Sequence, residues 1–263
     1  MPRALKTVPG FFTAGGAGTN IVAVSPGAVG TFVIDSFSNG KAYLESVWGN
    51  GATLDFLRVR SGRIHDAQQG IRLQVGAIQR ANLIPWPSQQ TFYPVDNLTV
   101  EADATGAGTQ AVALTYGFDD LGGTSQTIAR WEEVSPRIID IMGQQVNVVA
   151  SATIGTYGAG VALNAFADNW KAGQQYALLG YTLSTAVTCV SLNGVNTSGQ
   201  DIGFPGDTDA RETRDYFKKM AWETQRACIP IIDANNKGAT ILKCVDIAAA
   251  TATSVSLILA RLA

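Results

Sequence analysis

Two segments of the chain, residues 97–118 and 242–263, can be laid over each other without a gap at an offset of 145 positions. In the first segment Leu98, Val100 and Ala102 alternate with polar residues, and a glycine-rich turn then leads into a second alternating run. Alternation with a period of two is typical of strands that bury one face. The repeat constrains the fold more than any single motif does, because it predicts two similar β units in one chain.

The agreement between the two halves extends upstream of these strands. Over residues 83–118 against 228–263, six of thirty-six positions are identical. Two β segments rich in Ala, Thr and Val also reach partial agreement by chance, so the shared order of elements supports a duplication better than the identities do. The aligned pairs are Ile84-Pro85 on Ile229-Pro230, Val100 on Val245 and Leu114 on Leu259.

Strand patterns broken by turns occur in both halves. In the first half, β-branched and aromatic residues concentrate in the runs 31–37, 41–48 and 53–60. Asn-Gly pairs between these runs are typical of hairpins. Residues 64–82 fit either a strand or a weak helix containing Gly70 and Gly76. Strand patterns resume at Arg137 and continue through the segment QQYALLGYTLSTAVTCVSLNG.

One helix is predicted, over residues 209–227. Asp209 is placed to cap its first turn, with Glu212 reaching back in a capping box. Four residues at three- and four-residue spacing predict a buried stripe: Tyr216, Phe217, Met220 and Thr224. If the halves are duplicates, residues 64–82 should hold a poorer counterpart of this helix.

The patterns together predict an all-β chain with one or two short helices, divided into four parts. Residues 1–9 are expected to form an N-terminal arm that carries Arg3 and Lys6. Residues 10–120 form the first β unit, 121–136 the linker and 137–263 the second unit.

Charged residues make up 15% of the chain, against about 25% in an average soluble domain. The formal net charge is −2, and neither half has the basic footprint that a nucleic-acid binder needs. The nearest approach to such a footprint is Arg58, Arg60 and Arg63, which we interpret as a solvated strand face. A low charge content is expected either for a β protein with a weakly polar surface or for one whose surface is covered by copies of the same chain.

Residues that carry chemistry are few. His65 is the only histidine, which excludes a cupin-type metal site and leaves a Ser-His-Asp triad without a G-x-S-x-G elbow. Residues 15–20 (GGAGTN) lack the flanking strand and helix of a phosphate loop. We therefore expect no catalytic residue, no cofactor and no metal, and we expect His65→Ala to leave function intact.

Acidic and aromatic residues have structural interpretations. Five carboxylates cluster in sequence, Asp201, Asp207, Asp209, Glu212 and Asp215, and we interpret them mainly as a capped, solvated helix start in preference to a calcium loop at 207–209. The five tryptophans are dispersed, and core or subunit-interface packing is expected for most of them.

Cys189, Cys228 and Cys244 show no CxxC spacing. We expect them to be buried small hydrophobes in a protein made in reducing cytosol. The N-terminus has no secretory signature, and no apolar run approaches the length of a membrane span.

Two consecutive β units of about 120–145 residues, each with a helix before its last strands, resemble the double jelly-roll major capsid proteins of tailless icosahedral viruses. These include membrane-containing phages of the corticovirus and tectivirus type. The resemblance covers residues 10–263 and depends on the segments 84–118 and 229–263, the helix at 209–227, the linker and the arm. It implies two tandem eight-stranded jelly-roll β-sandwiches.

The resemblance implies a non-enzymatic coat protein. Three copies would form a pseudo-hexagonal tile of six rolls, and the tiles would build an icosahedral shell with the arm of Arg3 and Lys6 facing its interior. The implied location is the virion, after synthesis in the host cytoplasm. Penton or minor capsid proteins and an internal lipid membrane are further candidate partners, and no sequence-specific nucleic acid binding is expected. The alternative is a two-module β-sandwich binding protein, such as a lectin or a phage receptor-binding component.

Overall fold

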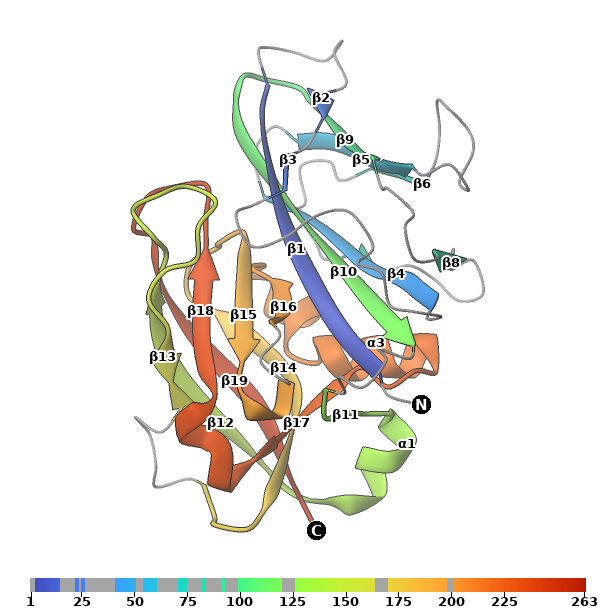
Figure 1. Cartoon of the computed structure of the whole chain (residues 1–263), viewed down its shortest axis with the longest axis vertical. Helices are drawn as coiled ribbons and strands as arrows, with labels where there is room; N and C mark the ends of the chain where they lie inside the picture. Colours follow the sequence, from blue (N-terminus) through green and yellow to red (C-terminus); the bar gives the residue numbers. More distant parts are fainter. Residues whose placement is uncertain are drawn as a thin grey trace.

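The structure is a computed structural model. It describes residues 3–14, 22–23, 25–26, 41–50, 54–60, 71–74, 82–83, 91–92, 99–119, 126–163, 170–197 and 201–263. In these ranges the chain forms two antiparallel β-sandwiches, one from each half, that lie against each other (Figure 1).

The first sandwich consists of a large and a small sheet. The large sheet has the strand order β3-β1-β10-β4-β7, with β8 also beside β4, and the small sheet has the order β2-β9-β5-β6. The strands of the large sheet are β1 (Arg3–Ala14), β3 (Ser25–Pro26), β4 (Lys41–Asn50), β7 (Asn82–Leu83), β8 (Thr91–Phe92) and β10 (Gly108–Asp119). Those of the small sheet are β2 (Val22–Ala23), β5 (Leu54–Arg60), β6 (Ile71–Gln74) and β9 (Thr99–Ala104).

The second sandwich has the same plan. Its sheets have the orders β11-β17-β14-β19-β12 and β13-β18-β15-β16. The strands of the first of these sheets are β11 (Ile128–Ala129), β12 (Ile138–Val149), β14 (Gln175–Leu183), β17 (Ile229–Asp233) and β19 (Ala252–Leu262). Those of the second are β13 (Val161–Ala162), β15 (Cys189–Asn193), β16 (Ile202–Pro205) and β18 (Ile241–Val245).

The two halves have identical strand orders. We leave aside β3, β8 and β11 and number the other described strands of each half from 1 to 8 along the chain. With this numbering, both halves have one sheet ordered 1-8-3-6 and one ordered 2-7-4-5. A double sheet of eight strands with these connections is a jelly roll. The predicted fold class, two tandem eight-stranded jelly-roll sandwiches, is therefore confirmed.

The repeat is also kept in strand register. In each small sheet, four residues lie opposite one another in a row on neighbouring strands, and they cross the equivalent strands in the same order in both halves. These residues are Val22, Ala102, Leu57 and Leu73 in the first half, and Val161, Leu242, Leu192 and Ile202 in the second half. In the large sheets, Leu114 lies between Val8 and Val47, and Leu259 lies between Met142 and Leu178.

The offset of 145 thus holds for the last strand, where Leu114 matches Leu259. It is wrong for the preceding strand, because Val100 is the second residue of β9 whereas Val245 is the last residue of β18. The loop between the last two strands is longer in the second half, and this shifts the alignment by several positions. Ile84 and Pro85 lie outside the described residues.

Each sandwich has its own apolar core. One cluster of buried residues lies between the sheets of the first half and includes Val8, Leu57 and Leu114. Another lies between the sheets of the second half and includes Val146, Leu192 and Leu259. The periodicity that the sequence shows is therefore the inward face of each sandwich.

The predicted arm at residues 1–9 is wrong for the part described. Residues 3–9 belong to β1, which pairs with β10 along its whole length, from Arg3 opposite Asp119 to Ala14 opposite Gly108. In the first part of β1 the outward Leu5, Thr7 and Pro9 are buried as well as the inward Ala4 and Val8. A strand with two covered faces shows no apolar–polar alternation, so the pattern could not reveal it.

The predicted linker at 121–136 is also partly structured. β11 joins the edge of the second sandwich by pairing with β17, and the short helix α1 (Trp131–Val134) follows it. The buried Gln126 makes two hydrogen bonds to the backbone of Leu5, at 2.7 Å from its N–H and 2.9 Å to its carbonyl. This side chain attaches the connection to β1.

The predicted helix at 209–227 forms as two pieces, α2 (Ala210–Thr213) and α3 (Tyr216–Thr224). The break lies at Arg214 and Asp215, where the backbone of α2 passes so close to Gly180 that no Cβ fits there. Asp209 caps α2 by accepting from the N–H of Arg211, as expected. The capping box is not formed, because Glu212 pairs with Lys219 instead. The predicted stripe is buried in full.

Within the described part of the chain, no helix combines the length and hydropathy of a membrane span. Several predictions fall outside the described residues: the strand at 31–37, the hairpin turns before residues 41 and 53, Arg63, His65, Gly70, Gly76, Trp86 and the loop at 15–20. Of the ambiguous stretch 64–82, the described parts are the strand β6 and the beginning of β7.

Candidate functional site

The outer face of the large sheet in the first sandwich is buried under the second sandwich. Leu5 is 1% exposed and belongs to the core of the second half. Trp48 and Ala113 form a cluster with Cys189 and Val245 of the opposite half. Figure 1 shows the strands β1, β10 and β4 running across the side of the second sandwich, beside β15, β16 and α3.

Hydroxyl groups bridge this contact. The Oγ1 of Thr7, which is 4% exposed, donates to the carbonyl of Gly203 at 2.5 Å. The hydroxyl of Tyr216, at the start of α3, bonds to the hydroxyl of Ser46 and lies 3.3 Å from that of Thr115. Buried polar groups without partners are costly, so these pairs favour one relative position of the two sandwiches.

A buried ion pair adds to the contact. The carboxylate of Glu45 is fully buried and accepts from Nη1 of Arg226 at 2.9 Å. The guanidinium of Arg226 also lies over the ring of Tyr43, 3.4 Å from its centroid. Removing either charge would take a close counter-charge from the other in a buried place, which is destabilising.

The equivalent outer face of the second sandwich is covered only in part. Its exposed part is the edge strand β12, whereas on the neighbouring β19 the residue opposite Ile141, Ala260, is fully buried. Along β12 the side chains alternate, with Val146 and Val148 in the core and Ile139, Ile141 and Val149 exposed on the outside. Ile139 is 51% exposed and Ile141 is 62% exposed. Exposed edge strands with apolar side chains tend to associate.

A surface hollow lies where β12 and β19 reach the end of the second sandwich. It has a volume of about 240 Å³ and is lined by Asp140, Ile141, Met142, Lys171, Tyr176 and Arg261. Asp140 and Arg261 form an ion pair across β12 and β19 at 2.6 Å. Asp140 and Met142 lie on the inward side of β12, so the hollow is at the open end of the sandwich and only Ile141 belongs to the outer side.

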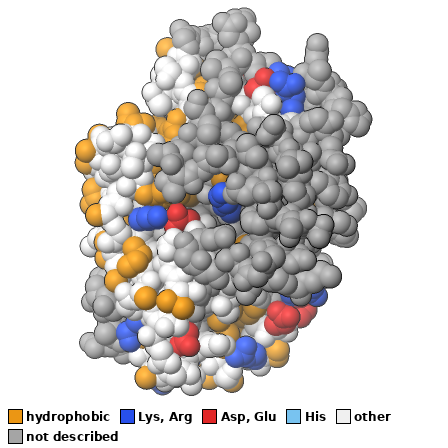
Figure 2. Space-filling model, in the orientation of Figure 1, with side chains coloured by type: hydrophobic (Ala, Val, Ile, Leu, Met, Phe, Trp, Pro, Cys, Tyr) orange, Lys and Arg blue, Asp and Glu red, His pale blue; other side chains and the backbone are white. Residues whose placement is uncertain are grey.

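Charges elsewhere on the described surface occur in small groups of both signs. Figure 2 shows them separated by neutral and hydrophobic side chains on the face in view. One such group lies on the first sandwich, where Glu101 on β9 binds Arg58 at 2.5 Å and Arg60 at 2.7 Å on β5. The hydrogen bond from Arg60 is the main cause that lowers the pKa of Glu101 below its ordinary value, with further contributions from Arg58.

The interpretation of Arg58 and Arg60 as a solvated face is therefore wrong. Both side chains are largely covered and are neutralised by a shared carboxylate. Lys6 is half-buried in β1 opposite Tyr116, and the backbone of Arg3 pairs with Asp119.

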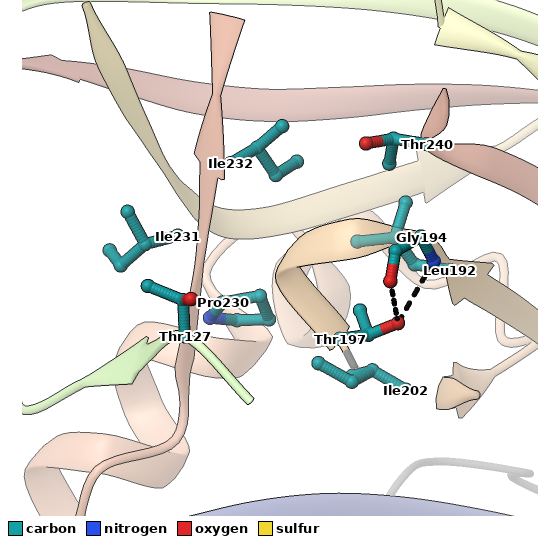
Figure 3. A pocket seen from close by; sticks show the side chains of 9 residues that line it. All are labelled: Thr127, Leu192, Gly194, Thr197, Ile202, Pro230, Ile231, Ile232 and Thr240. Carbon is teal, nitrogen blue, oxygen red and sulfur yellow. Dashed lines mark hydrogen bonds between the residues drawn. The ribbon is translucent and has the colours of Figure 1, made fainter. Parts of the chain in front are cut away.

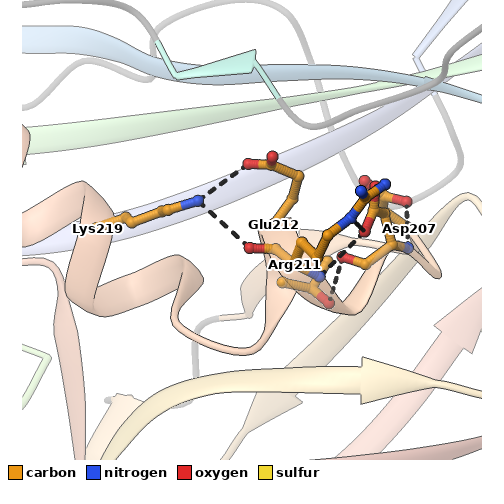
Figure 4. A network of polar contacts seen from close by, with 6 residues as sticks. Asp207, Arg211, Glu212 and Lys219 are labelled. Atoms are coloured by element: carbon orange, nitrogen blue, oxygen red, sulfur yellow. Dashed lines mark hydrogen bonds and ion pairs between the residues drawn. The ribbon is translucent and has the colours of Figure 1, made fainter.

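The predicted acidic cluster is not brought together as a binding site. Asp209 caps α2, Glu212 and Asp215 face Lys219, and Asp201 bonds to Lys243 at 3.0 Å. Figure 4 shows the contacts of Asp207, Arg211, Glu212 and Lys219 around α2 and α3. Within the described residues, no group of three or more His, Cys, Asp or Glu is arranged to hold a metal ion.

A pocket at the side of the second sandwich has little room. It is lined by Thr127, Leu192, Gly194, Thr197, Ile202, Pro230, Ile231, Ile232 and Thr240 (Figure 3). The hydroxyl of Thr197 bonds to the backbone of Gly194 on both its N–H and its carbonyl. The space between the side chains is too narrow for a water molecule, so this pocket is a packing feature.

The three cysteines are free and buried, as predicted. Burial raises the pKa values of the Cys189 and Cys244 thiols to about 12. Trp48 and Trp170 are buried, in agreement with the expected core packing, whereas Trp222 on α3 is exposed.

Sequence reasoning missed the residues that distinguish the two outer faces. Ile139 and Ile141 were read only as part of a strand pattern, although Ile138, Ile139 and Ile141 together make both faces of that strand apolar at its start. The exposed isoleucines of β12 could therefore have been predicted from the sequence. The Glu45–Arg226 pair could not, because the two residues are far apart in sequence and no local pattern links them.

No family model matches this sequence, and no curated protein matches it. Among similar solved structures, PBSX exported protein XepA is 10% identical over 97% of this chain and 86% of that chain, with a TM-score of 0.21. The STIV MCP is 8% identical over 99% and 96%, with a TM-score of 0.21. A chain from the atomic structure of Sulfolobus Turreted Icosahedral Virus is 10% identical over 100% and 91%, with a TM-score of 0.21. Superpositions this loose carry no argument about function.

Proposed function

We propose that the chain is a structural coat protein, the major capsid protein of an icosahedral virus shell, that assembles as pseudo-hexagonal trimers. The observation that carries the proposal is the internal repeat: both halves are jelly rolls with the same strand order and the same register. Three copies of such a chain supply six equivalent rolls. Three chains can therefore form a closed ring of six rolls that has nearly six-fold symmetry.

The surface supports an assembly role. Only 15% of the residues are charged, and interface cores are depleted in charge. Exposed isoleucines lie on an edge strand that nothing in the described chain covers. A shell gains its stability from many contacts of this kind repeated in every copy, so no single side chain need dominate.

The proposal places the protein in the virion and assigns it no catalytic step. It gives Arg3 and Lys6 no separate role as an arm, because both belong to β1. Contacts with vertex proteins and with a membrane beneath the shell are further parts of the proposal that the assembled particle would reveal.

Light scattering coupled to size-exclusion chromatography tests the proposal. We expect a trimer that forms sheets or shells as protein concentration or salt rises. A protein that stays monomeric at every concentration, and that binds a glycan on an array, would instead be a two-module sandwich binding protein.

A further inference from the structure

We infer that a second copy of this chain covers the exposed outer side of the edge strand β12, in the same way that the second sandwich covers the outer side of β1 within one chain. This inference rests on the proposed function and specifies which surface joins the copies. It predicts a head-to-tail contact, in which the second sandwich of one copy meets the first sandwich of the next.

The register of the large sheets defines the equivalent positions. Val8 faces Leu114 in the first sandwich, and Met142 faces Leu259 in the second. Thr7 is one residue before Val8, and it faces Thr115. Ile141 is one residue before Met142, and it faces Ala260. Thr7 and Ile141 are therefore equivalent positions on the two outer faces.

The equivalent positions differ in exposure because the outer side of β1 is covered and that of β12 is not. Thr7 is 4% exposed and Ile141 is 62% exposed. Nearby on the same sides, Leu5 is 1% exposed, and Ile139, which lies at a β-bulge, is 51% exposed. At the position of Thr7, the uncovered strand carries the larger apolar side chain. Leaving two isoleucines half or more in water costs free energy that burial against a neighbour would recover.

The register of the small sheets predicts which residue of the next copy contacts Ile141. Within one chain, Thr7 bonds to Gly203, which is the residue after Ile202 in the second half. Ile202 occupies the row position that Leu73 occupies in the first half. The residue after Leu73 is Gln74, at the end of β6. The repeat therefore places Ile141 of one copy next to Gln74 of its neighbour.

A contact of this type uses two different surfaces, so it is heterologous. Heterologous contacts make closed rings when the rotation between copies completes a circle, and open filaments when it does not. The two sandwiches of one chain already show the contact once. Repeating it between chains gives the ring of six rolls that three copies can close.

The first experiment replaces the apolar side chain by a charge. Ile141→Asp should raise by about tenfold or more the protein concentration at which half the chains are trimeric, because the carboxylate would be buried without a partner. The matched control is Val195→Asp, since Val195 is 61% exposed and lies outside this face on the short helix Val195–Thr197. The control should leave the trimer unchanged, and circular dichroism verifies that both variants fold.

The second experiment tests the geometry directly with a short bis-maleimide crosslinker. In the double variant Ile141→Cys/Gln74→Cys we expect linked dimers and trimers on a denaturing gel, with the ladder ending at three. Each single variant should give no ladder, and the three native cysteines should not react because they are buried.

The outcomes separate the inference from the proposed function. A wild-type trimer that Ile141→Asp leaves intact, with no crosslinked product from the double variant, overturns the inference alone. Crosslinking by Ile141→Cys on its own overturns it in favour of two β12 strands pairing edge to edge. A wild-type protein that is monomeric at all concentrations overturns both.

Discussion

Glu101 accepts hydrogen bonds from two arginines on the neighbouring strand, Arg58 and Arg60, and all three side chains are largely covered. Glu45 and Arg226 form a second pair across the contact between the sandwiches. At the residue scale, these buried and half-buried charges of the described chain are used against each other.

Replacing Glu101 by Gln should lower the free energy of unfolding at neutral pH by about 1 kcal/mol, because two partly buried guanidinium groups lose their counter-charge. The pKa of Glu101 is lowered in the folded state. Its contribution is therefore complete above the ordinary value of 4.5 and is lost as the pH falls through the lower folded value. Urea denaturation at several pH values should show the gap between wild type and variant closing in acid.

The control for this prediction is Glu132→Gln on the exposed side of α1. It should change the unfolding free energy by no more than a few tenths of a kcal/mol. A gap between wild type and Glu101→Gln that stays constant down to the lowest pH at which the protein folds would contradict the account.

The cysteines give a second prediction at this scale. The thiolate is the reactive form, and burial raises the pKa of Cys189 and Cys244 to about 12. The native protein should resist a maleimide at neutral pH, whereas the unfolded protein should take up three labels. Mass spectrometry after labelling measures both states. Rapid labelling of the native protein would show that these cores are open.

At the element scale, the outer sides of β1 and β16 approach each other closely. A Cβ placed on Gly203 would lie 2.5 Å from the Cβ of Thr7 and 3.1 Å from the Sγ of Cys189. The contact between the sandwiches therefore depends on the absence of a side chain at this position of β16. Both neighbours lie in β strands and cannot move away independently.

Gly203→Ala should destabilise the protein by about 1–3 kcal/mol, because the added methyl group overpacks the contact. The matched change Gly143→Ala in β12, measured at a concentration at which the protein is monomeric, should cost little, since a Cβ there meets nothing within 4 Å of the same chain. Thermal unfolding of the two variants beside wild type measures the difference. Equal effects from both substitutions would show that the contact is looser than the structure has it.

The sequence pattern matches burial best in the elements that bury one face. The strand at 53–60, the last strand of the chain and the stripe on α3 show a period that burial explains. β4 and β10 are buried on both faces, and they were predictable from the β-branched and aromatic residues of β4 and from the alternating large residues of β10. β1 has neither signal, because apolar and polar residues do not alternate along it. The break between α2 and α3 depends on Gly180, a residue of another strand, and local spacing carries no information about it.

At the scale of the whole molecule, the sequence predicted the duplication from the order of its elements, and the sheets show it in full. The alignment by residue was correct only where loop lengths agree, at Leu114 and Leu259. The difference between the faces was not predictable, because it arises only once the halves are packed together. One outer face is covered within the chain, and its counterpart on β12 is free for another copy.

Electron microscopy of the purified protein tests the central claim most directly. Three copies of a chain with two equivalent jelly rolls should give class averages with three-fold symmetry and six similar lobes, and those particles should tile into sheets or closed shells. Averages that show single two-lobed molecules, or two-fold pairs joined through one strand, would contradict it.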